Sequence, residues 1–149
     1  MKYTFKDMRI HYANQIKDWQ YEGYLKDIYM NPYFDNYNES TGEMKGPLNC
    51  DGFAVFKGVE LFGLFEYYHK DGVLEIGLAI NPIFVGKGYS KDFILEGIAF
   101  GVKEFKYSKN YILLSVEQEN ITAYKAYLKV GFKEYQRDTQ EIMMKYDLK

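Results

Sequence analysis

The chain has 149 residues and a mass of 17.6 kDa, which is enough for one domain with a sizeable core. Apolar residues make up 47% and aromatic residues 19%, and this composition excludes an intrinsically disordered chain. Nineteen basic and 21 acidic side chains leave a net charge of −2. That balance argues against a nucleic-acid-binding module, because such a module would usually carry a basic face.

Signals for export, membrane insertion and metal binding are missing from the sequence. The N-terminal residues lack the apolar core of a signal peptide, and charges interrupt every apolar stretch well before the ~20 residues of a membrane span. The single cysteine, Cys50, excludes an internal disulfide and a multi-cysteine metal site. We therefore expect a cytoplasmic protein without a membrane or metal partner, and we interpret Cys50 as a loop residue without a chemical role.

The first third of the chain predicts a strand, a helix and a polar segment. The strand is expected at Tyr3–Met8, and an apolar stripe of 3.6-residue period predicts a helix from Asn14 to about Tyr29. Residues Asn31 to Asp51 are polar and turn-rich and are expected to form a mobile segment over one face. Seven acidic residues against three lysines between Asn14 and Asp51 favour either a cationic partner or a solvated surface loop.

The rest of the chain combines six predicted strands with two helices. The strands are expected at Phe53–Lys57, Glu60–His69, Val73–Ile80, Tyr111–Val116, Phe132–Arg137 and Glu141–Asp147. The helices are expected at Ser90–Lys106 and at Asn120–Val130, the second ended by Gly131. This order predicts an α/β fold with a mixed sheet and helices on both faces. Because no linker-like stretch interrupts it, residues 1–149 are expected to form one domain.

A glycine loop between a strand and an amphipathic helix is the strongest local signal. It runs from Asn81 to Ser90, and Gly86 and Gly88 allow the backbone to turn and present N–H groups to an anion at the start of the helix. A nucleotide P-loop is excluded by its spacing, and a dinucleotide fingerprint fails because Lys91 stands where the third glycine belongs. A coenzyme A pyrophosphate site and a turn that merely starts a helix both remain open.

A second motif follows thirty residues later, in the predicted helix that starts at Asn120. Its pattern is N-x-x-A-x-x-x-Y-x-x-x-G-F, which this sequence matches at Asn120, Ala123, Tyr127, Gly131 and Phe132. Together with the glycine loop, in this order and with a strand between them, it resembles the GNAT family of N-acetyltransferases. The family's loop, Q/R-x-x-G-x-G/A, overlays Val85–Ser90, with Val85 in place of Gln or Arg. The resemblance covers the chain from about Phe53 to its C-terminus.

The resemblance implies a fold, a co-substrate and a set of contacts. The GNAT fold is a mixed, mostly antiparallel, twisted sheet of about seven strands with helices on both faces, and the co-substrate is acetyl-CoA. By this resemblance the backbone of Leu78, Ala79 and Ile80 would contact the pantetheine arm, as would Asn120. The pyrophosphate would be surrounded by Gly86, Lys87, Gly88, Tyr89, Ser90 and Lys91.

Two further residues acquire catalytic roles from the same resemblance. Tyr127 would lie near the thioester sulfur and protonate the departing thiolate, and Glu75 would be the base that deprotonates the amine. Without the motif, Tyr127 would be interpreted as an aromatic core residue, and Glu75 can equally be a solvent-facing strand residue. No cysteine stands in either motif, so we expect direct attack by the amine in a ternary complex.

Three classes of function are compatible with the sequence. The leading one is transfer of an acetyl group from acetyl-CoA to a primary amine of a small molecule or protein, in a protein that could form a homodimer and uses no metal. The second is a non-catalytic acyl-CoA-binding or regulatory module that keeps the fold. The third is an ordinary α/β interaction domain. The sequence does not identify the acceptor amine.

Overall fold

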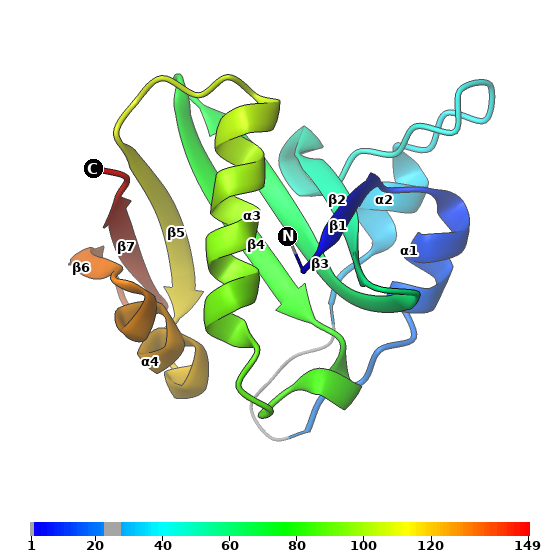
Figure 1. Cartoon of the computed structure of the whole chain (residues 1–149). Coiled ribbons are helices and arrows are strands. Elements are labelled where there is room, and N and C mark those ends of the chain that lie inside the picture. Colours follow the sequence, from blue (N-terminus) through cyan, green and yellow to red (C-terminus); the bar gives the residue numbers. More distant parts are fainter. Residues whose placement is uncertain (1, 23–27) are drawn as a thin grey trace.

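A single mixed sheet of seven strands, in the order β1-β2-β3-β4-β5-β7-β6, organises the computed structural model, which describes residues 2–22 and 28–149 (Figure 1). The strands are β1 (Thr4–Asp7), β2 (Asp51–Lys57), β3 (Glu60–Lys70), β4 (Val73–Ile80), β5 (Tyr111–Glu117), β6 (Lys133–Arg137) and β7 (Glu141–Asp147). Neighbouring strands are antiparallel except β4 and β5, which are parallel. The predicted mixed, mostly antiparallel sheet is confirmed.

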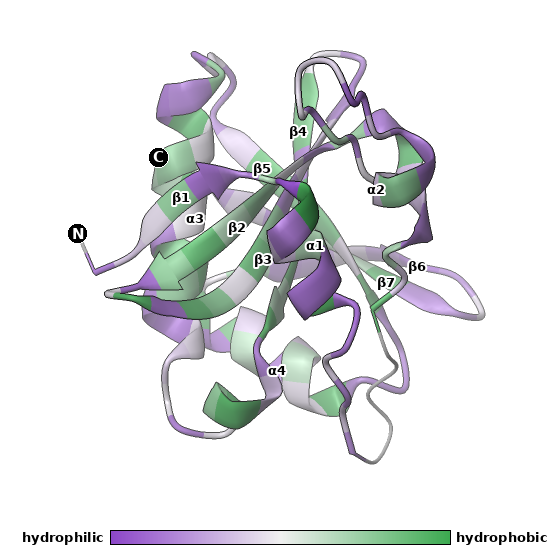
Figure 2. Cartoon of the chain, turned by 90° about the vertical axis from the view of Figure 1, so that its right-hand side faces the viewer, coloured by the Kyte–Doolittle hydropathy of each residue, from purple (hydrophilic) through white to green (hydrophobic). Residues whose placement is uncertain are grey.

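Helices cover both faces of this sheet. They are α1 (Ile10–Ile16), α2 (Asn31–Asp35), α3 (Ser90–Glu104) and α4 (Ile121–Val130), with short 3₁₀ turns η1 (Pro47–Asn49) and η2 (Pro82–Phe84). Helices α3 and α4 lie on one face, and α1 and α2 lie on the other, where α1 crosses β2 and β3 (Figures 1 and 2). The fold class predicted from the sequence is therefore confirmed.

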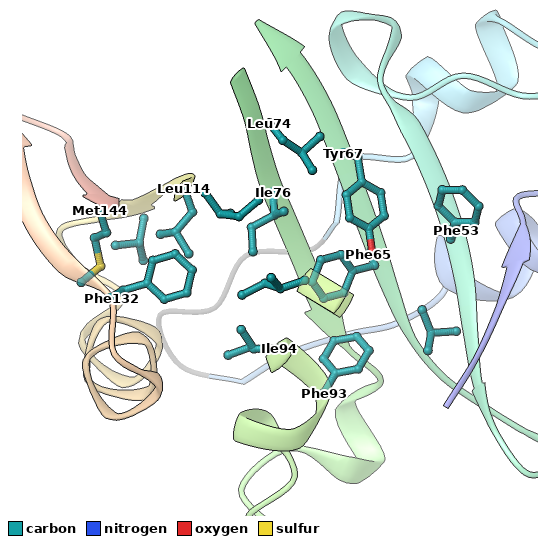
Figure 3. Close-up of a cluster of buried hydrophobic side chains, with 14 of the residues drawn as sticks. Phe53, Phe65, Tyr67, Leu74, Ile76, Phe93, Ile94, Leu114, Phe132 and Met144 are labelled. Carbon is teal, nitrogen blue, oxygen red and sulfur yellow. The ribbon is translucent and has the colours of Figure 1, made fainter. Parts of the chain in front are cut away.

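The larger core lies between the sheet and α3, as Figure 3 shows. Phe93 and Ile94 of α3 pack with Phe65 and Tyr67 of β3, and all four side chains are buried. A Cβ on Gly97 would lie 2.0 Å from the Phe65 ring, so a glycine at this position lets α3 approach β3 closely. This contact holds the start of α3 against the end of β4, where the candidate site lies.

A partly buried polar network fastens α2 to the opposite face of the sheet. The Tyr33 hydroxyl of α2 donates a hydrogen bond of 2.6 Å to Glu66 on β3, and the Tyr68 hydroxyl donates one of 2.9 Å to the other carboxylate oxygen. Burial raises the pKa of Glu66, because the charged carboxylate is poorly solvated there. Burial also raises the pKa of the neighbouring Cys50 thiol to about 12, so the thiol stays protonated at neutral pH.

The predicted helix at Asn14–Tyr29 is wrong. Helix α1 starts earlier, at Ile10, and ends at Ile16; residues 19–22 and 28–30 are not helical, and 23–27 lie outside the described residues. The apolar stripe that suggested a helix has another physical origin. Ile16, Trp19 and Ile28 all pack against the second core cluster, on the α1–α2 face, without sharing one helix.

The polar segment from Asn31 to Asp51 contains more structure than a mobile loop. It holds α2 and η1, and the side chains of Tyr33, Met44 and Cys50 are buried under it. Its placement over one face is as expected, but buried aromatic and apolar side chains anchor it there. The sequence did not reveal these anchors, because the polar residues between them dominate the composition of the segment.

The Glu66 network predicts a pH-dependent stability difference. A carboxyl whose pKa is raised on folding destabilises the protein as the pH rises above the pKa that the same carboxyl has in the unfolded chain. Wild type should therefore lose stability between pH 4 and pH 7 while Glu66→Gln does not, so the unfolding free energy of Glu66→Gln should increase relative to that of wild type, measured by urea titration. Glu60→Gln, at an exposed position at the start of β3, is the matched control. A constant difference between Glu66→Gln and wild type would contradict the role assigned to burial.

Candidate functional site

Divergence of β4 and β5 opens a cleft in the middle of the sheet. Among the described residues the two strands pair at one position, Glu75 with Leu113. Beyond it β4 continues to Ile80 and β5 to Glu117 without pairing each other. The space between and beyond the strand ends is a cleft of about 370 Å³.

The cleft is lined by residues from both strands and from the elements that follow them. Most of the predicted cofactor residues lie here, together with side chains that the sequence did not single out as site residues. The lining residues are Tyr21, Ile28, Leu78, Ala79, Ile80, Phe84, Val85, Gly86, Gly88, Tyr89, Ser90, Ile94, Glu117, Asn120, Thr122, Ala123, Ala126 and Tyr127.

The end of β4 directs alternate backbone groups into the cleft. The Asn81 N–H donates a hydrogen bond of 2.7 Å to the Phe62 carbonyl on β3, so the backbone groups of Asn81 face β3. By the alternation of a strand, those of Leu78 and Ile80 face the β5 side, where the cleft lies. The Ile80 carbonyl already accepts a hydrogen bond of 2.6 Å from the Tyr21 hydroxyl. The strand therefore offers polar backbone groups along one wall of the cleft.

The glycine loop closes one end of the cleft and leads into α3. Gly86 and Gly88 have φ values of +78° and +84°, a backbone conformation that favours glycine. A Cβ at either position would meet nothing within 4 Å, so it is the backbone conformation and not crowding that calls for glycine. Helix α3 then begins at Ser90, and its N-cap residue Tyr89 makes no side-chain cap hydrogen bond. Its first N–H groups and its positive dipole end thus favour an anion near the loop.

Helix α4 forms the opposite wall, and its ends follow from local sequence. Asn120 caps it by accepting a hydrogen bond of 3.2 Å from the Ala123 N–H, and Gly131 ends it with a φ of +122°. Tyr127 lies in the last half of α4, lines the cleft and packs its ring against Phe132 at 5.7 Å between centroids. Burial raises the pKa of the Tyr127 phenol to about 12. The hydroxyl therefore keeps its proton at neutral pH and can act as a donor.

Glu75 is not among the residues that line the cleft. Its carboxylate lies 3.3 Å from the Lys70 ammonium, and its side chain is 20% exposed. It stands at the one position where β4 still pairs with β5, before the strands part. Glu117 does line the cleft; the predicted strand ended at Val116, but β5 extends to Glu117 as its last residue.

The two lysines predicted to surround the pyrophosphate lie outside the cleft lining. Lys87 is exposed on the glycine loop. Lys91 lines a second, adjoining pocket of about 350 Å³ between the start of α3 and α4, together with Lys125 and Lys129. Ser90 lines both pockets, so the two spaces are continuous around the start of α3.

Tyr21 is the cleft residue that sequence reasoning located least well. It belongs to an aromatic segment, together with Trp19 and Tyr24, for which the sequence predicted a helix from Asn14 to about Tyr29. Tyr21 reaches the cleft, Trp19 packs against the second core cluster, and Tyr24 lies outside the described residues. The density of aromatic residues was the available signal, and it could not say which ring would reach the cleft.

Neither a metal cluster nor a membrane-spanning helix accompanies this site. Within residues 2–22 and 28–149, no group of three or more His, Cys, Asp or Glu side chains is arranged to hold a metal ion. No helix in the same part of the chain is long and apolar enough to cross a membrane.

Solved structures of N-acetyltransferases share this fold. A chimera of the spermidine N-acetyltransferase SpeG from Vibrio cholerae and hSSAT is 19% identical, with a TM-score of 0.76 over 99% of this chain and 96% of that one. SpeG from Vibrio cholerae in complex with CoA and spermine is 18% identical, with a TM-score of 0.69 over 99% and 96%. The N-acetyltransferase PseH from Campylobacter jejuni, in complex with acetyl coenzyme A, is 22% identical, with a TM-score of 0.59 over 67% and 69%.

The chain matches no protein-family model and no curated protein sequence. At these identities the structural likeness establishes the fold: the chain has the GNAT fold of the N-acetyltransferases. The expectation drawn from the glycine loop and the Asn120–Phe132 motif is confirmed at that level.

Removing the cap of α4 should destabilise the protein measurably. Asn120→Ala deletes the side-chain oxygen that accepts from Ala123, and such losses cost about 1 kcal/mol. We expect a corresponding drop in the unfolding free energy in urea titrations. Asn120→Asp keeps an acceptor oxygen at the cap and should retain most of the stability. Equal stability of Asn120→Ala and wild type would show that the cap contributes nothing.

Proposed function

We propose that this chain is one GNAT domain, spanning residues 1–149, that transfers an acetyl group from acetyl-CoA to a primary amine. The observation that carries the proposal is the cleft itself, which has at one end a glycine loop whose backbone conformation suits an anion and in its wall a protonated phenol, Tyr127. The named structural neighbours that bind CoA or acetyl coenzyme A have the same fold.

Different residues of the chain would bind the pyrophosphate and the pantetheine arm of acetyl-CoA. In the proposal the N–H groups of the glycine loop and of the first turn of α3 bind the pyrophosphate, helped by the positive end of the helix. The backbone groups of Leu78 and Ile80, together with Asn120, hydrogen-bond the pantetheine arm. Tyr21 then stands at the Ile80 carbonyl, to which its hydroxyl donates a hydrogen bond.

Transfer requires two proton movements. The amine nitrogen attacks the acetyl carbon, the carbon–sulfur bond breaks, and the sulfur leaves as a thiolate that needs a proton. Tyr127 supplies that proton, since its raised pKa keeps the phenol protonated over the whole physiological range. The amine loses its proton to a carboxylate, for which Glu75 is proposed. The Cys50 thiol is buried next to Tyr33 of α2 and does not line the cleft, in keeping with direct attack by the amine.

The proposed acceptor is a primary amine, given as a chemical class and not as one compound. SpeG was solved with spermine, and the sequence between Asn14 and Asp51 carries a net negative charge that would attract a cationic acceptor. A panel of amines that includes polyamines, amino sugars and peptides tests this step by release of free thiol. The expected homodimer is a separate proposal, measured by sedimentation.

The glycine loop can be tested by binding alone. Gly88→Asp places a negative charge where the phosphates are proposed to bind, and we expect acetyl-CoA affinity in calorimetry to fall at least tenfold. Gly58→Asp is the matched control, since Gly58 also has a positive φ (+63°) and open space around it but lies in the β2–β3 turn. If Gly88→Asp binds as tightly as Gly58→Asp, the pyrophosphate is not at this loop.

Tyr127→Phe separates an enzyme from a binding module. The variant keeps the ring and loses the hydroxyl, so turnover should fall about tenfold or more while acetyl-CoA affinity stays within about twofold. Tyr124→Phe, whose hydroxyl bonds Glu134 and does not line the cleft, should leave turnover unchanged. Full turnover in Tyr127→Phe removes this residue from the mechanism. Wild-type protein that binds acetyl-CoA but acetylates no amine would instead identify a regulatory module.

The identity of the general base can be tested by replacing two glutamates, one at a time. Glu75→Gln should slow turnover most at low pH, where the acceptor amine is protonated and most needs a base, and less at high pH. Glu117→Gln is the comparison, because Glu117 lines the cleft and Glu75 does not. Initial rates across pH decide the assignment: a low-pH loss confined to Glu117→Gln would transfer the role to Glu117.

A further inference from the structure

Three lysines surround the pocket that adjoins the cleft. The pocket has a volume of about 350 Å³, and its walls are Ser90 and Lys91 from α3 and Thr122, Lys125, Ala126 and Lys129 from α4. We call this space the lysine pocket. Its polar lining side chains are three ammonium groups and two hydroxyls, and none of them is acidic. All of them can donate hydrogen bonds, and such a set suits an anion.

None of these ammonium groups forms a close ion pair in the described part of the chain, although the neighbouring Asp92 carboxylate attracts Lys91. No salt bridge within 4.0 Å joins Lys91, Lys125 or Lys129 to an acidic side chain there. Other lysines of this chain are engaged: Lys70 pairs with Glu75, and Lys57 lies 3.8 Å from the centre of the Tyr89 ring. The lysine pocket therefore gathers three like charges, none of which is held in a close ion pair.

Lys129 lies in the last turn of α4, where the helix dipole favours a cation, but two other features of these lysines oppose helix stability. Lys125 and Lys129 are four residues apart on α4, a spacing at which like charges repel. Lys91 lies in the first turn of α3, where the helix dipole disfavours a cation. A bound anion would remove both penalties, whereas solvent alone only screens them.

The lysine pocket also lies at the charged end of the cleft. Ser90, Thr122 and Ala126 line both spaces, so a ligand that runs along the cleft past the glycine loop reaches the lysine pocket next. CoA carries a pyrophosphate and, further from the thioester, a phosphate monoester on its ribose. The monoester bears close to two negative charges at neutral pH, which matches a cluster of ammonium groups better than a diester would.

We propose that the lysine pocket binds the ribose phosphate monoester of the acyl carrier, and that this chain thereby selects CoA over dephospho-CoA. This inference rests on the proposed function, because it places the rest of the same carrier in the cleft. The inference adds selectivity between carriers to that function. Lys125 and Lys129 would bind the phosphate monoester, and Lys91 would lie between the monoester and the pyrophosphate.

Calorimetry with CoA and dephospho-CoA tests the selectivity. Wild type should bind CoA about tenfold or more tightly than dephospho-CoA, and higher salt should reduce the ratio. In Lys125→Gln/Lys129→Gln the CoA affinity should fall to that of dephospho-CoA, while the dephospho-CoA affinity stays within about twofold. The control Lys103→Gln/Lys133→Gln removes the same charge from exposed positions that do not line the pocket and should keep the tenfold ratio.

The outcomes separate the two proposals. Equal affinity of wild type for both carriers, or a ratio that survives in Lys125→Gln/Lys129→Gln, overturns the selectivity and leaves the acetyl-CoA cleft in place. A ratio lost equally in the control double variant also overturns it, since the effect would then be one of net charge. Failure of wild type to bind either carrier overturns the proposed function and this inference together.

Discussion

The structure depends on the parting of β4 and β5. A parallel pair inside a sheet normally satisfies backbone groups on both strands, but here pairing stops at Glu75 and Leu113. The groups of Leu78 and Ile80 are thus left facing a cleft, and unpaired backbone groups away from water are costly. The Tyr21 hydroxyl satisfies one of them, at Ile80. A polar ligand that runs along the strand can satisfy the others, so the interruption of the sheet creates the site.

The elements around the cleft give it two chemically different ends. At one end the glycine loop, the uncapped start of α3 and the neighbouring lysines favour negative charge. Further along, the walls are apolar side chains and a phenol whose burial keeps it protonated. A long ligand with an anionic end and a neutral, reactive end fits this gradient. That gradient connects the fold, which the chain shares with N-acetyltransferases, to the chemistry proposed for it.

The opposite face of the sheet has its own polar centre, and its role is structural. Glu66 accepts hydrogen bonds from Tyr33 and Tyr68 and ties α2 to β3 over 33 residues of sequence separation. Partial burial opposes the charge of this carboxylate, and the hydrogen bonds from the two phenols partly offset that cost. The same region buries Cys50, whose thiol stays protonated and takes no part in the cleft.

The sequence by itself determined the elements whose signals are local. The strands, the turn at Gly86 and Gly88, and the capped helix between Asn120 and Gly131 follow from backbone preferences within a few residues, and all were predicted close to their observed bounds. These elements carry most of the predicted cofactor residues, because loop and helix present them directly to the cleft.

Only the tertiary structure decided what depends on distant partners. The end of α1 at Ile16 follows from packing on the sheet and not from the apolar stripe, and Tyr21 reaches the cleft through a hydrogen bond to a residue 59 positions away. Glu75 faces Lys70 because the alternation of β4 turns it away from Leu74 and Ile76 in the core. Local sequence patterns predict which side of a helix or strand is buried. Long-range contacts decide which elements then pack together, and no short stretch of sequence contains that information.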